Sequence, residues 1–246
     1  MHYNLPKIFH SLSLRVPQAY ALRSGLRVLA QTKQQNSLFW STFTSREYMS
    51  LMPAIIKSGI QPKTFIDCGA ATGYVTMLMH HLIQSGVLDW KLDTTVCIEP
   101  SSYNADVLKE NLSMNGLKAE MIFGVVGKRD GDVKFFESKQ HPWSSSVGQR
   151  FHSGNAIVRK YIDLMPLLQR GNCFLKVDVE GSEFDLIETY KESWPNVQGM
   201  ILEWHNELGD VAAAERTLME KGLVLAATSL DKDNRRVSLY LRQTNA

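Results

Sequence analysis

The segment TFIDCGAATGY, residues 64–74, decides the fold class of this 246-residue chain. Its opening apolar run, residues 64–67, predicts a short buried strand. Two glycines follow, Gly69 and Gly73, and helical spacing extends over residues 74–85. A glycine-bearing turn between a strand and a helix is typical of open α/β sheets, in which ligands bind at the carboxyl ends of the strands.

The rest of the chain continues this alternation. Short apolar, β-branched runs predict strands at residues 95–98, 119–125, 173–177, 199–202 and 223–228. Helical spacing predicts helices at residues 46–59, 102–114, 184–192 and 211–221. Residues 128–164 are more irregular, with a hairpin strand expected at 133–136, and a last strand at 236–241 is expected to run antiparallel. We therefore expect an α/β fold with a single doubly wound, mostly parallel sheet and an antiparallel last strand.

The first 46 residues differ in charge from the rest of the chain. They contain no acidic residue, and apolar residues are interspersed with six basic ones: Lys7, Arg15, Arg23, Arg27, Lys33 and Arg46. This composition predicts a basic N-terminal helical arm, residues 1–46, before a single domain, residues 47–246. Such an arm can pack over a ligand cleft or at a subunit contact of a homo-oligomer, lie on a membrane surface, or serve as a transit peptide.

The overall composition narrows the class of protein. With 44% apolar residues the chain can bury one core, and a net charge of +2 is too small to indicate nucleic acid as a bulk partner. No apolar run approaches the ~18 residues needed to cross a bilayer, so we expect a cytoplasmic protein whose only membrane contact is peripheral, through the arm. Cys68, Cys97 and Cys173 lie in apolar runs and are expected to be reduced core residues.

The residues that end the first two strands predict a nucleotide-type site. Gly69 permits close approach to a ligand, Gly73 permits tight helix packing, and Asp67 places a carboxylate at the cleft floor. The spacing D-x-G-x-x-x-G lacks the second glycine of G-x-G-x-x-G, which disfavours a dinucleotide. Glu99 ends the second strand, where it can accept both hydroxyl protons of a ribose or, alternatively, favour the N-terminus of the next helix. Residues 123–126 would flank an adenine.

From residue 64 to residue 205 the chain resembles the FkbM family of methyltransferases. The opening motif of that family, D-x-G-A-N-x-G-Y, corresponds to residues 67–74, with Ala71 in place of asparagine. Further motifs follow in order: Glu99-Pro100, Asn115-Gly116, Val125-Val126-Gly127 through Gly131, the hallmark Lys176-Val177-Asp178-Val179-Glu180-Gly181-Ser182-Glu183, and Glu203-Trp204-His205. The resemblance implies a class I, Rossmann-like methyltransferase domain that uses S-adenosylmethionine, usually to methylate oxygen on a sugar, polyketide or lipid-linked acceptor.

Combining the turn, the second strand and the resemblance gives an expected cofactor site. Its members are Asp67, Gly69, Ala70, Thr72, Gly73, Tyr74, Glu99, Pro100, Val125, Val126 and Asp178. Asp67 is expected to face the methionine or ribose end of the cofactor. A serine-bearing stretch at residues 143–146 either binds a sugar-like acceptor or forms a polar surface loop.

Methyl transfer needs an aligned acceptor and a base that takes its proton. Asp178 and Glu180 follow the fourth strand, and Glu203 and His205 follow the fifth, so both pairs are expected at one cleft mouth. His205 is the first choice of base, since a neutral imidazole is available near pH 7, and Glu180 is the second. As a less favoured alternative, the four residues would bind a divalent cation such as Mg²⁺.

Other functions remain in competition with O-methylation of a sugar, lipid-linked glycan or secondary metabolite. A non-catalytic S-adenosylmethionine-binding scaffold would use its arm to recruit a partner, and a dinucleotide-dependent oxidoreductase would need the missing glycine motif. Methylation of nucleic acid is not expected, because the chain lacks both a Pro-Pro pair after the fourth strand and a broad basic signature. Lys176 and Glu183 are interpreted as structural residues.

Overall fold

A seven-stranded sheet forms the centre of the computed structural model, which describes residues 17–44, 46–137, 146–147, 155–230 and 235–243. The strand order is β11-β12-β10-β9-β3-β4-β5, and β12 alone runs antiparallel, between β10 and β11. The strands are β3 (Thr64–Cys68), β4 (Thr94–Ile98), β5 (Glu120–Ile122), β9 (Cys173–Val177), β10 (Val197–Trp204), β11 (Leu223–Leu230) and β12 (Arg236–Arg242). This arrangement confirms the expected class I, Rossmann-like sheet.

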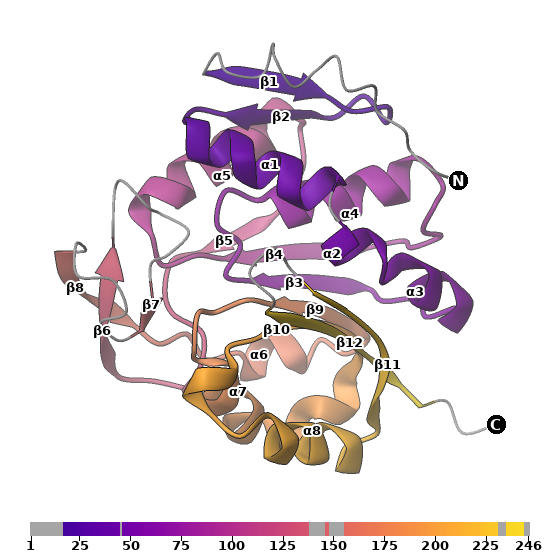
Figure 1. Ribbon diagram of the computed structural model, residues 1–246, viewed down its shortest axis with the longest axis vertical. Helices are drawn as coiled ribbons and strands as arrows, with labels where there is room; N and C mark the ends of the chain where they lie inside the picture. The colour runs from indigo at the N-terminus through magenta and orange to yellow at the C-terminus, as the bar shows by residue number, and fades with distance from the viewer. Residues whose placement is uncertain (1–16, 45, 138–145, 148–154, 231–234, 244–246) are drawn as a thin grey trace.

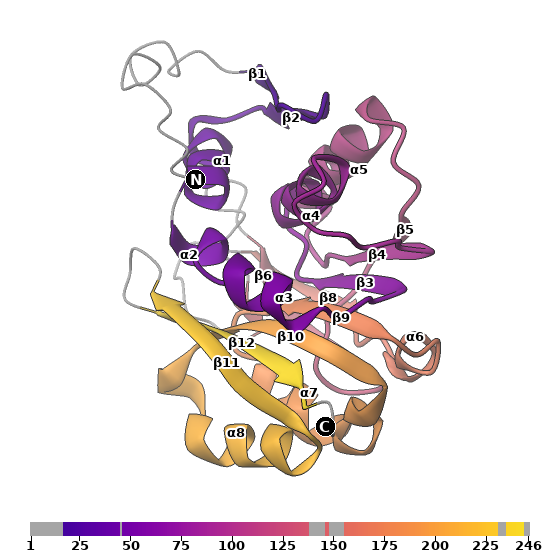
Figure 2. The same ribbon diagram turned by 90° about the vertical axis from the view of Figure 1, so that its right-hand side faces the viewer.

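Helices cover both faces of the sheet (Figures 1 and 2). One face carries α3 (Met52–Ser58), α4 (Tyr74–Gln84) and α5 (Ser102–Met114). The other carries α6 (Met165–Leu168), α7 (Glu183–Thr189), α8 (Val211–Glu220) and the 3-10 turns η3 (Lys191–Asn196) and η4 (Asn206–Leu208). Successive strand residues point to opposite faces of the sheet and join different hydrophobic cores. Phe65 packs toward α3 and α4, whereas Ile66 packs toward α7 and α8. The short apolar runs of the sequence are therefore buried on both sides.

The predicted helix over residues 46–59 is divided into two. The first part, α2 (Arg46–Met49), ends before Pro53, which lies in the first turn of α3. Proline has no N–H to donate to the carbonyl four residues earlier, so one continuous helix cannot pass through this position. The predicted end is confirmed, because Gly59 caps α3 with a φ of 64°.

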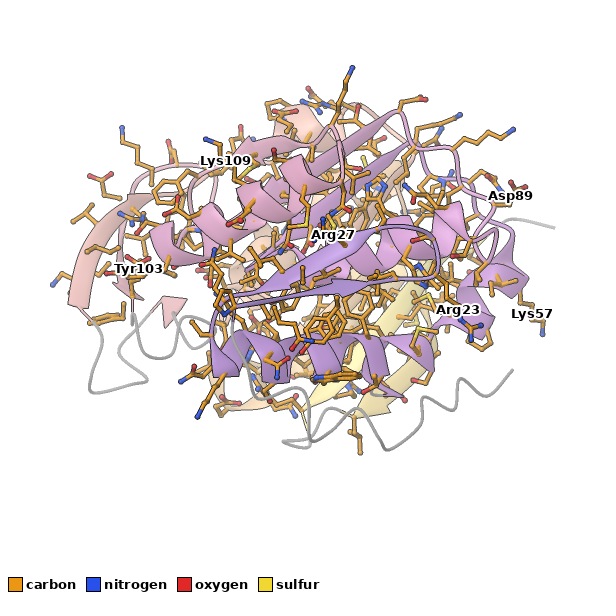
Figure 3. All side chains as sticks on the ribbon, turned by 90° about the horizontal axis from the view of Figure 1, so that it is seen from above. Arg23, Arg27, Lys57, Asp89, Tyr103 and Lys109 are labelled. Carbon is orange, nitrogen blue, oxygen red and sulfur yellow. The ribbon has the colours of Figure 1, made fainter. Side chains whose placement is uncertain are left out.

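The expectation of a helix is wrong for residues 18–30. These residues form an antiparallel hairpin of β1 (Gln18–Ala21) and β2 (Arg27–Ala30), which turns at Gly25 with a φ of 91°. Side chains at the C-terminal end of α5 satisfy the outer edge of β2, since Asn111 on the helix and Asn115 directly after it each accept a backbone N–H at 2.7 Å. Seen from above, the hairpin that carries Arg23 and Arg27 lies beside α1 (Lys33–Thr44) and over α4 and α5 (Figure 3).

The helical part of the expected arm is α1, whereas residues 1–16 lie outside the described residues. The boundary of the arm at residue 46, its membrane contact and a homo-oligomer stay predictions. Within the described ranges, no helix is both long enough and apolar enough to span a membrane.

A second, smaller sheet lies beside the carboxyl end of β4. It contains β6 (Asp132–Glu137), β7 (Ser146–Val147) and β8 (Asn155–Lys160), with β6 in the centre. The predicted hairpin strand corresponds to β6, whereas β8 was not predicted. Residues 143–145 of the serine-bearing stretch lie outside the described residues. Arg159 on β8 donates to the carbonyl oxygen of Pro100 at 2.7 Å, so this sheet supports the loop after β4.

Candidate active site

Two adjoining cavities open at the carboxyl ends of β3, β4 and β9. The first, of about 90 Å³, lies between the loop after β4 and the segment after β5. The second, of about 290 Å³, lies between α1 and the ends of β9 and β10. Four residues line both cavities: Leu38, Ala71, Asp178 and Glu180. The cavities therefore form one cleft, covered on one side by α1.

The two glycines of the turn are required by close packing against protein atoms. A Cβ on Gly69, which has a φ of 74°, would lie 1.8 Å from the carbonyl oxygen of Asp178. A Cβ on Gly73, with a φ of 82°, would lie 2.5 Å from the side chain of Leu108 on α5. Gly69 also lines the smaller cavity, whereas Gly73 lines neither and serves helix packing. Ala71 between them adopts a φ of 47°, a left-handed conformation that alanine rarely adopts.

Asp67 does not face the cleft, which corrects the role expected from the sequence. Its side chain is fully buried and lines neither cavity. One carboxylate oxygen accepts a 2.6 Å hydrogen bond from Thr76, and the other lies 3.5 Å from the ammonium group of Lys176. Lys176 in turn donates to the carbonyl oxygen of Gly69 at 2.6 Å. Asp67 thus holds the turn from beneath.

Glu99 lies at the smaller cavity and is almost completely buried. Its carboxylate accepts backbone N–H groups of Ala71 at 2.7 Å and Ser101 at 2.8 Å. Burial raises the pKa of Glu99 to about 7, although these bonds and one from Asn104 oppose the shift. The remaining wall is mainly apolar and is formed by Pro100, Val125, Val126 and Phe135. A carboxylate beside an apolar slot is suited to an adenosine group.

Acidic side chains gather at the other end of the cleft. Asp178, Glu180, Glu203 and Glu47 all line the larger cavity. Arg235 approaches them, with its guanidinium 3.0 Å from Glu203 and 3.9 Å from Glu180. Burial, followed by the negative charge of Asp178, raises the pKa of Glu203 well above its ordinary value despite the opposing effect of Arg235. Glu203 therefore binds a proton more readily than a solvated glutamate does.

His205 is not available as a neutral base, which corrects its expected role. The imidazole is fully buried and lines neither cavity. Its Nδ1 lies 3.0 Å from Glu183, and its Nε2 lies 3.2 Å from Glu180. Burial by itself lowers the pKa of His205, but hydrogen bonds to Glu180 and Glu183 outweigh it and raise this pKa to about 10. At pH 7 the ring is therefore an imidazolium held between two carboxylates.

The same residues do not fit a divalent metal ion. Oxygen and nitrogen atoms of Asp178, Glu203 and His205 lie within 4.8 Å of one another, as a shared ion would require. However, Lys176 lies 3.5 Å from Asp178, and Arg235 lies 3.0 Å from Glu203. Because His205 also directs both nitrogens at glutamates, protein cations already neutralise this cluster.

The structure brings most of the predicted site residues into the cleft. Those that line it are Gly69, Ala70, Thr72, Tyr74, Glu99, Pro100, Val125, Val126, Asp178, Glu180 and Glu203. Sequence reasoning missed Leu38 on α1, Glu47 on α2, and Arg235, which precedes β12. None of them belongs to a motif, and only the folded chain brings their elements to the ends of β9 and β10.

Comparisons with known proteins give a consistent but distant result. No family model matches the chain. The chain is 22% identical over 192 residues to Methyltransferase 1 of Beauveria bassiana (strain ARSEF 2860), covering 68% of this chain and 74% of that protein. It shares 10% identity and a TM-score of 0.46 with magnesium protoporphyrin IX methyltransferase of Synechocystis PCC 6803, over 87% of this chain and 86% of that one.

A further likeness is to an S-adenosylmethionine-dependent methyltransferase of Clostridium acetobutylicum ATCC 824. It has 9% identity and a TM-score of 0.44, over 86% of this chain and 99% of that one. The strand order, the cleft and the similarity to Methyltransferase 1 together support a class I, S-adenosylmethionine-dependent methyltransferase. Membership of the FkbM family stays a prediction.

Proposed function

We propose that this chain transfers a methyl group from S-adenosylmethionine to a hydroxyl oxygen of a small acceptor. The observation that carries this proposal is the continuity of the cleft. Its smaller cavity has Glu99 and apolar walls, its larger cavity has acidic and hydroxyl side chains, and Asp178 and Glu180 lie where the two meet. A donor and an acceptor bound in these cavities would meet at that boundary.

The residues present fit S-adenosylmethionine. Glu99 would accept the ribose hydroxyl protons, and the slot formed with Val125 and Val126 would flank the adenine. Asp178 supplies a carboxylate oxygen, Oδ1, that is buried and has no hydrogen-bond partner among the described residues. The ammonium group at the methionine end of S-adenosylmethionine would be a fitting partner for this oxygen.

The chemistry divides simply between cofactor and protein. S-adenosylmethionine supplies an electrophilic methyl carbon when it is bound. The protein has to align the acceptor oxygen and accept its proton, and a positioned base typically contributes ~10²- to 10⁴-fold. Glu180 is our choice of proton acceptor, because it lines both cavities and its side chain is 18% exposed. Leu38 on α1 lies over the boundary and helps to exclude water.

The lining of the larger cavity supports a hydroxylated acceptor, such as a sugar, a glycan or a secondary metabolite. On α1, four side chains present uncharged hydrogen-bonding groups to this cavity: Gln34, Ser37, Ser41 and Thr42. Hydroxyl groups of an acceptor could exchange hydrogen bonds with them without burying a further charge. A scaffold that only binds S-adenosylmethionine would have no need for such a second cavity.

Calorimetry tests this function first. S-adenosylmethionine and a nicotinamide dinucleotide are titrated separately into the wild type, Glu99→Ala and the control Glu110→Ala, which removes an exposed carboxylate on α5. We expect binding of S-adenosylmethionine alone, weakened by Glu99→Ala and unchanged in the control. Transfer of labelled methyl to a panel of methyl glycosides, with and without Mg²⁺, then tests turnover. Failure of the wild type to bind S-adenosylmethionine would overturn the proposal.

A further inference from the structure

A buried carboxylate outside the cleft connects the two segments that carry the acidic cluster. Glu183, the first residue of α7, is fully buried. Its Oε1 accepts both the backbone N–H of His205 at 2.9 Å and the ring Nδ1 at 3.0 Å. Its Oε2 accepts the backbone N–H of Gly181 at 2.8 Å. One side chain therefore ties the end of β10 to the loop that follows β9.

The ring of His205 links Glu183 to Glu180, which lines the cleft. Because Glu183 fixes Nδ1, the opposite nitrogen, Nε2, is directed at Glu180, whose Oε2 lies 3.2 Å away. Arg235 is more distant from Glu180, at 3.9 Å, makes its shorter contact with Glu203, and has its guanidinium 3.3 Å from the same Nε2 of His205. His205 is thus the nearer cation to the carboxylate of Glu180. A buried acid that fixes the orientation of an imidazole is also found in catalytic triads, although here the charged ring serves to orient Glu180 and does not itself accept a proton.

The backbone conformation of Glu180 explains why it has to be held by Glu183 and His205, which we call the clamp. Glu180 has a φ of 51°, and Gly181 after it has a φ of 108°. A left-handed conformation is unfavourable for a residue with a Cβ and persists only where the surroundings impose it. Glycine at position 180 would adopt it without strain but would bring no carboxylate to the cleft. The loop therefore contains a strained residue that is held at two points. His205 contacts the side chain of Glu180, and Glu183 accepts the backbone N–H of Gly181.

We propose that Glu183 and His205 are positioning residues that hold Glu180 in its left-handed conformation, with its carboxylate at the boundary of the two cavities. What Glu180 does there rests on the proposed methyl transfer, whereas the clamp itself does not. Without the pair, Glu180 relaxes into the right-handed or extended region and its carboxylate leaves the boundary. Glu183, which the sequence suggested was structural, thereby determines the geometry of the acidic cluster.

The test uses Glu183→Gln, which keeps the size of the side chain. An amide has one accepting oxygen, so it cannot accept from His205 and Gly181 together. We expect hydrogen exchange to become faster by roughly tenfold or more, the factor for one hydrogen bond to a charged group, at the backbone amide of Gly181 or of His205, whichever loses its acceptor. Glu188→Gln, which removes an exposed carboxylate on the same helix, is the matched control and should leave Gly181 unchanged. Unaltered exchange at both amides in Glu183→Gln would overturn the proposal.

A second measurement needs no variant. Nitrogen NMR of the wild-type His205 ring at pH 8 should show both nitrogens protonated, because each donates to a carboxylate. A ring with an unprotonated Nε2 would have no proton to give Glu180 and would refute the clamp. Calorimetry with S-adenosylmethionine keeps the two proposals apart. If the wild type fails to bind it, the proposed function is wrong, while the exchange and NMR results still decide whether the clamp exists.

Discussion

The ammonium group of Lys176 lies 3.5 Å from the carboxylate of Asp67, directly beneath the turn that opens the cleft. The same group donates to the carbonyl oxygen of Gly69 at 2.6 Å and lies 3.5 Å from Asp178. Burial by itself lowers the pKa of Lys176, but the charges of Asp178 and Asp67 outweigh it and raise this pKa above its ordinary value. One buried cation therefore joins β9, the turn after β3 and the acidic end of the cleft.

Replacing this cation should strongly destabilise the fold. In Lys176→Met the carboxylate of Asp67 loses its ion pair inside the core, and removing one partner of a buried pair typically costs about 3 to 5 kcal/mol. Urea denaturation measures the loss of unfolding free energy. Lys191→Met is the control, because its pair with Glu188 is exposed and contributes little. Equal stabilities for the two variants would show that the buried pair does not hold the turn.

Ala71→Asn should stabilise the protein. Ala71 has a φ of 47°, and asparagine tolerates the left-handed region better than alanine, a gain of about 1 kcal/mol. The same substitution at Ala212, an exposed residue within α8, should destabilise slightly, because asparagine is the weaker helix former. Thermal unfolding of both variants checks the opposite signs. A destabilised Ala71→Asn would mean that the new side chain clashes within the cleft.

Most of the fold could be predicted because local patterns carry it. The runs that became β3, β4 and β9 are apolar on both faces, and Gly59 and Gly73 mark helix boundaries through backbone conformations that favour glycine. The hairpin of residues 18–30 was missed for the opposite reason. Its outer edge is satisfied by Asn111 and Asn115, which lie more than eighty residues away along the chain. The local sequence around residues 18–30 gives no sign of hydrogen-bond partners so distant along the chain.

The sequence predicted which residues form the site better than it predicted what each residue does there. Motif spacing placed Glu99, Asp178, Glu180 and Glu203 at one edge of the sheet, because the carboxyl ends of neighbouring parallel strands meet there. Whether a histidine is neutral or charged, however, depends on groups that only folding brings near it. His205 was expected to be a free base, yet Glu183 and Glu180 hold it as a cation.

Affinity for S-adenosylmethionine should increase with pH through the titration of Glu99. Burial raises the pKa of Glu99 to about 7, so near pH 6 only about one molecule in ten presents the carboxylate that accepts ribose hydroxyls. We expect the dissociation constant to fall about tenfold between pH 6 and pH 8, and Glu99→Gln to remove this dependence. Calorimetry at several pH values measures it. A wild-type affinity that is independent of pH would argue against contact between Glu99 and the ligand.

The ion pairs of His205 should make stability depend on pH in the alkaline range. Hydrogen bonds to Glu180 and Glu183 outweigh burial and raise the pKa of His205 to about 10, from an ordinary value of 6.5. A cation with a raised pKa in the folded state stabilises the fold fully below pH 6.5, and this contribution is lost as pH rises toward 10. The loss proceeds at up to about 1.4 kcal/mol per pH unit.

His205→Gln lacks this contribution at every pH, so the difference in unfolding free energy between it and the wild type should be largest near pH 6.5 and shrink as pH rises toward 10. Urea denaturation across this range measures the difference. Because both proteins keep Glu99 and Glu203, the titration of those carboxyl groups affects the two curves in the same direction and largely cancels. A difference that stayed constant from pH 6.5 to pH 10 would show that His205 is neutral in the folded protein, and the imidazolium clamp on Glu180 would then have no charge to hold it.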